Sequence, residues 1–363
     1  SFLQYARLSG LVPRIAVVSG RCFAGNAVFA GCSDLMIATE NACIGMAGPA
    51  MIEGGGLGSF RPEEVGPVSV QRHNGVIDCV VKDEEEGAAL AKKLMGYFQG
   101  PVDNWDCEDQ RWLRRAIPEN RLHAYDVRSL IRTLVDSDSY LELRPDFAPG
   151  MITAFIRIEG RPLGLIANDP KVLGGAIDAP GADKASRFMQ LCDAFSIPML
   201  SLCDTPGFMV GPEEEKTATV RHTCRMFVTA ASLSVPLFSI VLRKGYGLGA
   251  QGMTGGSFHA PFYCASWPTG EFGGMGLEGA VNLAYRKELD AQETPEERQA
   301  LYEKLVAQLY EKGQALSMAA ALEIDAVIDP VDTRAWVMRG LRAQPPEGMA
   351  PIAGKRRPMI DTW

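Results

Sequence analysis

Histidine is scarce in this sequence, and paired cysteines are missing. The four histidines, His73, His123, His222 and His259, include no pair with metal-ligand spacing, and the nine cysteines include no C-x-x-C pair. These absences exclude zinc ribbons and thioredoxin-type motifs. The odd number of cysteines and their apolar neighbours predict reduced thiols that pack as small hydrophobic groups. We therefore expect no bound metal and a reducing, cytoplasmic compartment.

Long apolar runs and surplus positive charge are missing as well. No stretch is apolar over the length of a membrane-spanning helix, and no basic-then-apolar leader opens the chain. The formal net charge is −8, whereas nucleic-acid-binding proteins usually carry a basic footprint. We therefore expect neither a membrane nor a nucleic-acid partner, and the basic cluster at 355–357 is interpreted as a solvated tail. With 363 residues, the chain is long enough for two domains.

The common signatures of a catalytic nucleophile or a nucleotide site are absent too. Neither a G-x-S-x-G elbow nor a P-loop occurs. Asp204 and the acidic run 213–215 are candidate acid–base groups, but a turn residue and an exposed acidic loop are the commoner roles of such residues. Each histidine is likewise more often a surface or structural residue than a catalytic one.

An internal repeat organises the chain. Residues 12–27 read VPRIAVVSGRCFAGNA, and residues 235–250 read VPLFSIVLRKGYGLGA. At a constant offset, Gly25 aligns with Leu248 and Asn26 with Gly249. Each copy consists of an apolar strand, a glycine-bearing turn and small residues that can open a helix. The repeat therefore predicts two related halves.

The second copy has a lead-in that the first copy lacks, because the chain starts eleven residues before Val12. The patterns in and around that lead-in predict a helix over 125–135, a hairpin over 150–168 turning at 160–162, a helix over 183–195, a buried strand over 198–203 and a loop over 204–208. A capping box at Thr294–Glu297 predicts the start of a long helix. We expect a fragment whose first half lacks its opening. The expected boundaries are an N-terminal half at 1–100, a connector at 101–149, a C-terminal half at 150–344 and a tail at 345–363.

The two glycine-bearing turns are the candidate chemical groups. A strand that passes through such a turn into a helix points backbone N–H groups outward, and the helix N-terminus adds partial positive charge. Such a turn can stabilise an anion that forms during a reaction, and small residues let the ligand approach the backbone. Two matched turns indicate a reaction in which two anions develop.

Longer stretches of the sequence resemble a known family. The stretch at 125–169, the stretch GGAIDAPGADKASRFMQLCDAFSIPMLSLCDTPGFMVG at 174–211 and the stretch WPTGEFGGMGLEGAVN at 267–282 are similar to the carboxyltransferase component of biotin-dependent acyl-CoA carboxylases. SGRCFAGNAVFAGCSDLMIAT at 19–39 is similar to the N-terminal half of that family. The resemblance implies an α/β fold of two crotonase-like ββα-superhelix halves related by duplication.

The resemblance also implies a mechanism. In that family, carboxybiotin breaks down to CO2 and a biotin enolate, which removes the α proton of the acyl-CoA. The thioester enolate then attacks CO2, and no protein base is required. By position, Gly25 and Asn26 would stabilise the thioester enolate, and Leu248 and Gly249 the biotin enolate. The positions implied for binding acyl-CoA or biotin are Ala24, Gly207, Phe208, Met209, Gly247, Gln251, Met275 and Gly276.

Further expectations concern the cofactor and the partners. The chain lacks an ATP-grasp module and the Met-Lys-Met biotin-attachment motif, so biotin would be carried by a separate domain or subunit, and coenzyme A would be part of the substrate. The implied partners are a biotin carboxyl carrier, a biotin carboxylase and further copies of the chain, arranged as a hexamer built from a trimer of dimers. The active site would lie between the N-terminal half of one copy and the C-terminal half of another.

The sequence departs from the family pattern in two places and leaves alternatives open. Asn26 and the pair Leu248–Gly249 differ from the family's usual Gly-Gly and Gly-Ala, and EGGGLGSF at 53–60 departs from the usual run. Gln251 would help set the acyl range, or else be a surface amide. The alternatives are a decarboxylase or transcarboxylase component, a non-catalytic acyl-CoA-binding subunit and an enoyl-CoA hydratase-type lyase. Neither acyl length nor the direction of the reaction follows from the sequence.

Overall fold

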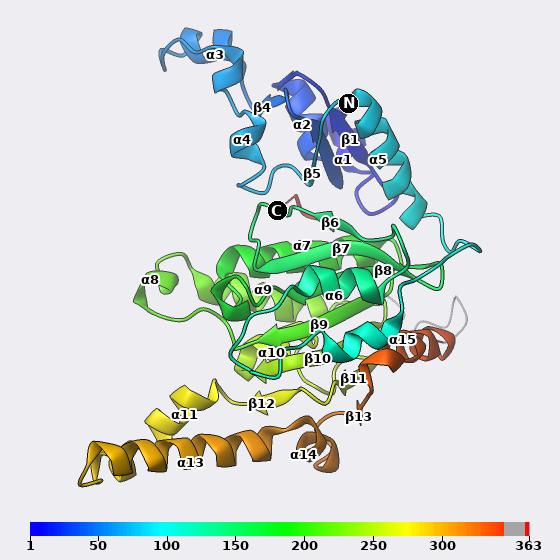
Figure 1. Cartoon of the computed structure of the whole chain (residues 1–363). Coiled ribbons are helices and arrows are strands. Elements are labelled where there is room, and N and C mark those ends of the chain that lie inside the picture. Colours follow the sequence, from blue (N-terminus) through cyan, green and yellow to red (C-terminus); the bar gives the residue numbers. More distant parts are fainter. Residues whose placement is uncertain (345–359, 363) are drawn as a thin grey trace.

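The computed structural model describes residues 1–344 and 360–362, and the chain forms an α/β fold (Figure 1). The strands are β1 (Ile15–Val18), β2 (Arg21–Phe23), β3 (Leu35–Thr39), β4 (Cys43–Gly45), β5 (Cys79–Val81), β6 (Leu141–Leu143), β7 (Met151–Ile158), β8 (Arg161–Asn168), β9 (Met199–Thr205), β10 (Leu237–Tyr246), β11 (Tyr263–Ser266), β12 (Glu271–Gly273) and β13 (Ala326–Val327). The longer helices are α5 (Glu84–Tyr97), α6 (Val127–Leu134), α7 (Ala179–Ala194), α9 (Thr219–Ala230), α11 (Leu277–Ala284), α13 (Pro295–Gly313) and α15 (Thr333–Arg342). The shorter ones are α1 (Phe2–Ala6), α2 (Gly25–Gly31), α3 (Pro49–Gly54), α4 (Val68–Gln71), α8 (Pro212–Glu215), α10 (Gly247–Met253), α12 (Arg286–Asp290) and α14 (Ala315–Ala320), with 3-10 turns η1 (Pro62–Glu64), η2 (Gln110–Arg115), η3 (Leu173–Gly175) and η4 (Pro330–Asp332).

An eight-stranded sheet forms the body of the C-terminal half. Its strand order is β13-β11-β10-β9-β8-β7-β6, and β12 pairs with the end of β10. Alternate residues of β7 and β8 enter two different cores, as the two-residue period of a strand requires. One core lies under α7, and the other lies under α6 and α15. Both faces are therefore covered, which explains why β9 and β10 are buried almost throughout.

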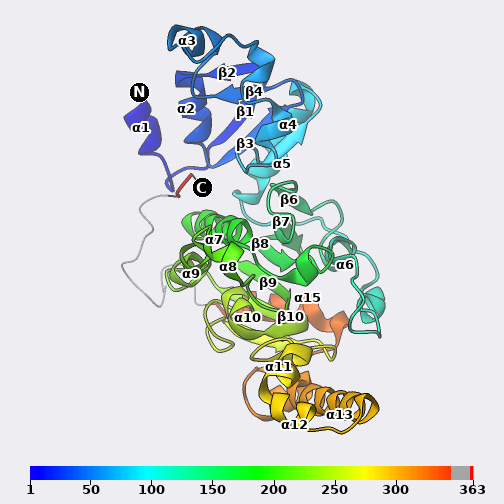
Figure 2. The same cartoon turned by 90° about the vertical axis from the view of Figure 1, so that its left-hand side faces the viewer.

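The N-terminal half repeats part of this connectivity on a smaller scale. Its strands β1, β3 and β5 form a parallel sheet in that order, and β2 pairs with β4 (Figure 2). In the C-terminal half, β10, β11 and β13 are likewise parallel neighbours in that order, and the end of β10 pairs with β12. Helix α2 follows β2 just as α10 follows β10. The α/β fold class that the resemblance implies is confirmed.

Most of the expected elements are present. The capping box at the start of α13 is formed, since the Thr294 side chain accepts a hydrogen bond from the Glu297 N–H and the Glu297 carboxylate accepts one from the Thr294 N–H. The hairpin β7–β8 is present, but its turn consists of Glu159 and Gly160, not residues 160–162. Both turn residues have positive φ, 50° and 75°, as tight two-residue hairpin turns require, so Arg161 already belongs to β8. The expected tail from residue 345 lies outside the described residues, apart from 360–362.

The sequence pattern predicted that helix α7 would bury one apolar face, but the helix is buried on nearly all sides. It starts at Ala179, four residues before the expected position, because the Asp178 side chain accepts a hydrogen bond from the Gly181 N–H and caps it. Nearly all of its residues are buried, including Asp183, Lys184 and Arg187. Lys184 donates to the carbonyl oxygens of Arg144 and Phe147, over 2.7 and 2.8 Å. The helix is central because it packs between the large sheet, α9 and the N-terminal half.

The two halves share a core and a buried ion pair. Leu35 and Leu94 of the N-terminal half belong to the same hydrophobic cluster as Phe155 and Phe188 of the C-terminal half. Arg144 Nε donates to Asp78 Oδ1 over 2.9 Å, and both side chains are buried. No helix in the described ranges is long and apolar enough to cross a bilayer.

Candidate functional site

The first turn joins β2 to α2 through a left-handed residue. Ala24 has φ 51° and ψ −121°, and its N–H donates to the Gly45 carbonyl oxygen over 3.2 Å. Gly25 and Asn26 follow as the first residues of α2, where N–H groups have no partner within the helix. Neither N–H has another acceptor among residues 1–344 and 360–362. Two donors therefore remain free at this turn.

The second turn joins β10 to α10 in the same way. Gly247 has φ 57°, and Leu248 and Gly249 follow it in α10. The N–H groups of Leu248 and Gly249 have no acceptor in the part of the chain that the structure describes. Leu248 is 64% exposed, so the turn lies at the surface. The two copies thus present two pairs of free N–H donors.

Gly249 lies against the loop that follows β9. A Cβ atom at Gly249 would lie 2.5 Å from the carbonyl carbon of Gly207 and 2.9 Å from the Phe208 nitrogen. The Thr205 hydroxyl accepts a hydrogen bond from the Gly207 N–H over 3.1 Å, and Met209 donates to the Ile177 carbonyl over 2.8 Å. The structure therefore brings the expected binding positions Gly207 and Phe208 beside the second turn, and Met209 follows them in the same loop.

A pocket of about 450 Å³ adjoins the second turn. Gly247, Gln251 and Met275 line it, so three more of the expected binding positions lie there. Gly276 follows Met275 and caps α11. At the first turn, Asn26 lines a separate pocket of about 320 Å³, which includes the polar side chains of Tyr5, Ser19, Arg21 and Ser33.

The structure does not bring the two turns together within one chain. Helix α2 lies in the N-terminal half, and α10 lies far from it, across the body of the C-terminal half (Figures 1 and 2). Ala24, Gly25 and Asn26 therefore form one group, and the other expected site residues form a second. A reaction that used both turns would require a second copy of the chain.

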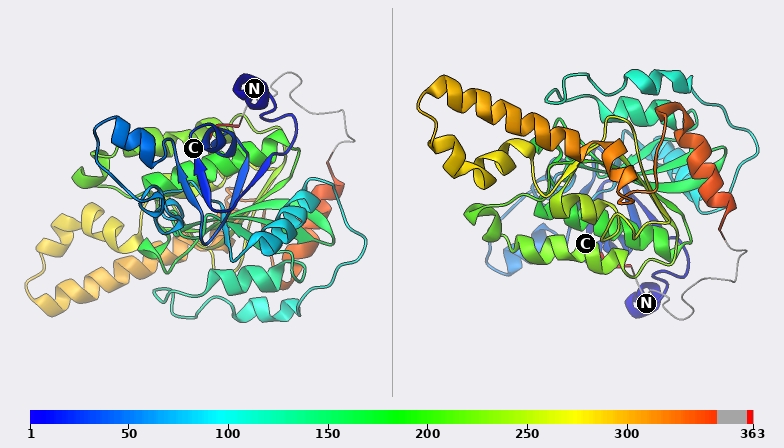
Figure 3. Two further views of the ribbon diagram at one scale, coloured as in Figure 1. Left: turned by 90° about the horizontal axis from the view of Figure 1, so that it is seen from above. Right: turned by 90° about the horizontal axis from the view of Figure 1, so that it is seen from below.

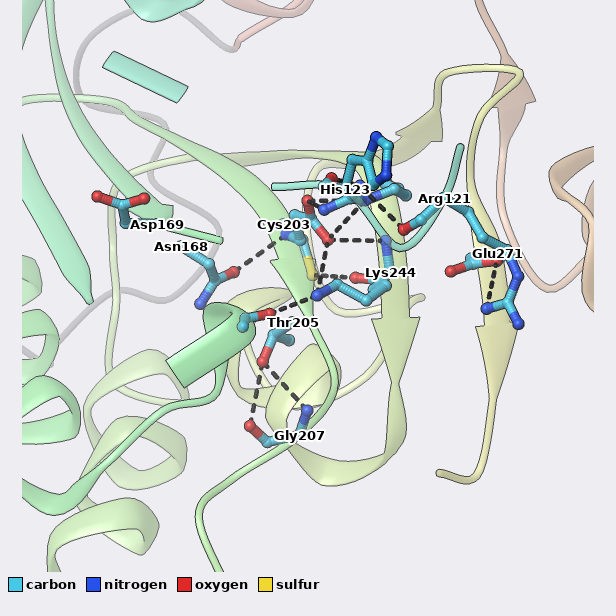
Figure 4. Close-up of polar contacts among 12 residues, drawn as sticks. Arg121, His123, Asn168, Asp169, Cys203, Thr205, Gly207, Lys244 and Glu271 are labelled. Atoms are coloured by element: carbon cyan, nitrogen blue, oxygen red, sulfur yellow. Dashed lines mark hydrogen bonds and ion pairs between the residues drawn. The ribbon is translucent and has the colours of Figure 1, made fainter. Parts of the chain in front are cut away.

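A buried charged cluster beneath the second turn was missed by the sequence interpretation (Figure 4). Asp204 was expected to be a turn residue, and this is wrong: it lies in β9 with none of its surface exposed. Arg243 of β10 pairs with it over 3.0 Å, and the Lys244 N–H donates to its Oδ1 over 3.1 Å. The desolvated carboxylate is compensated by the Arg243 guanidinium, by the Lys244 N–H and by the Lys244 ammonium group 3.8 Å away. These contacts fix the end of β9 to the end of β10 just before the turn.

Arg121 and His123, which belong to the connector, extend this cluster. The Arg243 guanidinium donates to the carbonyl oxygens of Arg121 and His123, over 3.0 and 2.7 Å. Arg121 in turn lies 3.8 Å from Glu271 and pairs with Glu278. Neither carboxylate oxygen of Glu271 has a hydrogen-bond partner in the described ranges, and burial raises the pKa of Glu271 against the opposing charge of Arg121. The connector and the segment after β12 are thereby held against the second turn.

One sequence signal could have revealed this cluster. Asp204 ends the apolar run LSLCD, and Arg243 and Lys244 end the apolar run SIVLRK. Parallel neighbouring strands bring their carboxyl ends to one edge of a sheet, so opposite charges at both ends indicate a buried pair. The histidines, in contrast, lie outside both turns. His222 contacts Asp183 over 2.6 Å, and no group of His, Cys, Asp and Glu in the described residues is arranged to hold a metal ion.

Comparison with known proteins gives consistent matches. The model of the carboxyl transferase domain matches residues 1–359. The methylmalonyl-CoA carboxyltransferase 12S subunit of Propionibacterium freudenreichii subsp. shermanii is 33% identical, with 94% of this chain and 66% of that protein aligned. The propionyl-CoA carboxylase beta chain of Saccharopolyspora erythraea is 31% identical, with coverages of 94% and 66%. The chain thus spans just under two thirds of these relatives.

Solved structures match as well. A single-chain, multi-domain long-chain acyl-CoA carboxylase is 56% identical, with a TM-score of 0.88 over 93% of this chain and 33% of that chain. The transcarboxylase 12S structure, described as a hexamer with methylmalonyl-CoA bound, is 31% identical, with a TM-score of 0.84 over 96% of this chain and 69% of that chain.

Proposed function

The chain belongs to the carboxyl transferase domain family, and from this we propose that it is an enzyme that moves a carboxyl group from carboxybiotin to the α-carbon of an acyl-CoA. The observation that supports this proposal is the matched pair of turns. Each turn has a left-handed residue, Ala24 or Gly247, followed by two backbone N–H groups without acceptors among the residues that the structure describes. A transfer through two enolates requires two such donor pairs.

The residues of this chain would act by orientation and charge stabilisation. Gly25 and Asn26 would donate their N–H groups to the thioester oxygen as the α proton leaves and negative charge develops. Leu248 and Gly249 would donate theirs to the ureido oxygen of biotin. Carboxybiotin, on a carrier domain, supplies both the CO2 and the base that accepts the α proton. This assignment explains why no histidine is needed at either turn.

The assembly follows from the separation of the two turns. Both must reach one acyl-CoA and one biotin, yet α2 and α10 lie far apart in one chain (Figure 1). We infer that the first turn of one copy meets the second turn of another, in dimers that combine into a hexamer. The hexameric state of the transcarboxylase 12S relative supports this arrangement.

The substrate and partners are proposed from the relatives. The 56% identity to a long-chain acyl-CoA carboxylase favours a long acyl chain over the propionyl group of the relatives that are 31% identical. The biotin carboxyl carrier and biotin carboxylase would be domains of the same polypeptide or separate subunits. Because a methylmalonyl-CoA decarboxylase subunit of Veillonella parvula is also 31% identical, a component that works in the decarboxylating direction is the second candidate.

The proposal is tested by transfer from a defined donor. The chain would be mixed with a biotinylated carrier domain, previously carboxylated, and with acetyl-, propionyl- or palmitoyl-CoA. Mass spectrometry of the CoA ester would then detect the added carboxyl group. Product from at least one ester, absent when either the chain or the biotin is omitted, is the expected result. Failure with all three esters, with a folded oligomer, would refute the proposed function.

A further inference from the structure

Two buried polar side chains without hydrogen-bond partners lie beside the entry to the second turn. Tyr246 is the last residue of β10 and directly precedes Gly247, and only 2% of it is exposed. Glu271 is the first residue of β12 and is 1% exposed. Within the described part of the chain, neither the Tyr246 hydroxyl nor either carboxylate oxygen of Glu271 has a hydrogen-bond partner. Such groups are rare in folded proteins, because an unpaired buried polar atom is costly.

The pairing of β12 with β10 places these two side chains next to each other. Lys244 pairs with Glu271, and Tyr246 pairs with Gly273. Residues two apart in a strand share a face, so Tyr246, Glu271 and Gly273 lie on one face of the two strands. Gly273 has no side chain, and a Cβ atom there would lie 3.4 Å from the Tyr246 ring. The ring therefore lies over Gly273, and burial together with the nearby Glu271 raises the pKa of the Tyr246 hydroxyl.

The cations near Glu271 have closer partners elsewhere. Arg121 Nη1 lies 3.8 Å from the Glu271 carboxylate but pairs directly with Glu278. Three other charged groups near Glu271 contact one another: Asp204, Arg243 and Lys244. A buried carboxylate without a hydrogen bond or a cation of its own is disfavoured, and burial raises the pKa of Glu271. Glu271 therefore retains its proton at higher pH than an exposed glutamate, and its O–H group can donate to the Tyr246 hydroxyl.

We propose that Tyr246 and Glu271 are positioning residues, a hydrogen-bonded pair that holds the second turn in the geometry that its N–H donors need. The inference rests on the proposed function, in which Leu248 and Gly249 donate to the ureido oxygen of biotin. Negative charge develops on that oxygen during transfer. A neutral pair supports the turn without opposing this charge, whereas an ionised Glu271 would repel it through the low-dielectric interior.

The strand that carries Glu271 also forms one wall of the second turn. Three residue pairs join β12 to β10, and a Cβ atom at Gly247 would lie 2.8 Å from the Gly274 carbonyl oxygen. Strand β12 then leads into α11, the first helix of an arm, α11 to α13, that projects from the body of the molecule (Figure 3). A bond between Tyr246 and Glu271 therefore fixes the wall and the turn to each other at the base of this arm.

The first test compares two buried tyrosines. Tyr263 of β11 is the matched control: it is 7% exposed and its hydroxyl likewise lacks a partner in the described residues, but it pairs with Phe238 at the other end of β10. Tyr246→Phe and Tyr263→Phe would be assayed for carboxyl transfer in the assembled enzyme. Hydrogen–deuterium exchange of α10 would be measured without any ligand, since this readout does not depend on turnover.

We expect Tyr246→Phe to lower kcat by about 10-fold, the size of one hydrogen bond, with the KM for acyl-CoA unchanged. The same variant should speed exchange of the α10 amides, because the helix start is held less firmly. Tyr263→Phe should change neither quantity. Thermal melting of both variants checks that the fold is retained.

The second test varies the charge of the carboxyl group. Glu271→Leu removes the bond and should lower kcat as Tyr246→Phe does. Glu271→Gln stays neutral and still donates a hydrogen bond, so it should recover most of the lost rate. Its kcat relative to wild type should rise from pH 5 to pH 8, because wild-type Glu271 loses its proton as the pH passes its raised pKa, whereas glutamine does not ionise.

Three results would overturn the inference while wild-type transfer leaves the proposed function intact: wild-type kcat in Tyr246→Phe, an equal loss in Tyr263→Phe, or a rate ratio of Glu271→Gln to wild type that does not change with pH. If Tyr246→Phe does not fold, the comparison of Glu271→Leu with Glu271→Gln decides, and equal rates in these two overturn the inference. A wild-type chain without transfer activity refutes the proposed function instead, and unchanged α10 exchange in Tyr246→Phe then overturns the positioning role by itself.

Discussion

Ala24 and Gly247 occupy equivalent positions in the two copies of the repeat, and both have left-handed backbones, with φ 51° and φ 57°. In each copy this residue turns the chain from a strand into a helix, and the two free N–H groups follow it. Glycine adopts such φ values without steric cost, whereas alanine does not. The first turn therefore holds a strained residue that the second turn avoids, and strain of this kind amounts to about 1–3 kcal/mol.

Exchanging these residue types should change stability in opposite directions. Ala24→Gly removes the strain, and we expect it to raise the free energy of unfolding by about 1 kcal/mol. Gly247→Ala introduces strain and places a Cβ atom 2.8 Å from the Gly274 carbonyl oxygen, so it should lower that free energy. Urea unfolding of both variants measures the difference. Equal changes of the same sign in both variants would contradict the difference in backbone strain between Ala24 and Gly247.

Removing one N–H donor should slow transfer without unfolding the protein. Asn26→Pro and Leu248→Pro each delete a free donor in the first turn of a helix, where proline is tolerated and no helical hydrogen bond is lost. We expect kcat to fall by about 10²–10³-fold in each. Leu248→Ala keeps the N–H group and serves as the control. Thermal melting checks the fold, and a proline variant with full activity would exclude that turn from the reaction.

Mixing the two proline variants should restore activity if each site combines turns from two copies. When Asn26→Pro and Leu248→Pro chains pair at random, about half of the dimers are mixed, and each mixed dimer contains one intact site and one doubly defective site. The mixture would therefore regain about a quarter of the wild-type rate. The two chains would be co-expressed with different tags and assayed together. If each site were built within one chain, no intact site could form and the rate would stay at the level of the variants.

The buried pair beneath the second turn should matter far more than an exposed pair. Asp204→Asn leaves Arg243 buried without a carboxylate, and we expect a loss of about 3–5 kcal/mol of unfolding free energy. Arg111 and Asp109 form a pair of comparable geometry on the surface. Asp109→Asn should therefore leave stability nearly unchanged. Denaturant unfolding of both variants measures the two effects, and similar losses in both would contradict the structural role given to Asp204.

Glu271 should make stability fall as pH rises. Its pKa is raised by burial, so the folded protein keeps this proton at pH values where the unfolded chain, with a pKa of about 4.3, has lost it. The stabilisation is full below the unfolded pKa and disappears as the pH passes the folded pKa. Glu271→Gln should flatten the dependence and be at least as stable as wild type at pH 8. Urea unfolding of both proteins at pH 5 and pH 8 tests this. If the free energy of unfolding changes equally with pH in wild type and in Glu271→Gln, Glu271 ionises normally.

The turns could be found from the sequence, but their separation could not. Small residues after apolar strands mark both turns, and the aligned positions Ala24 and Gly247 have the same left-handed φ. The distance between the turns depends on how the halves pack, which no local pattern encodes. Asp204 was misplaced for a related reason: an acidic residue before Thr-Pro-Gly is typical of a turn, and only the neighbouring strand supplies Arg243. The burial of α7 on all sides likewise arises from tertiary packing.

The core shared by the two halves has a consequence for folding. Although the repeat suggests two units, Leu35 and Leu94 pack in the same cluster as Phe155 and Phe188. The buried pair of Arg144 and Asp78 crosses between the halves as well. Separating them would expose apolar surface and leave buried charges unpaired. The duplicated architecture should therefore melt as one cooperative unit, and neither half should persist alone as a folding intermediate.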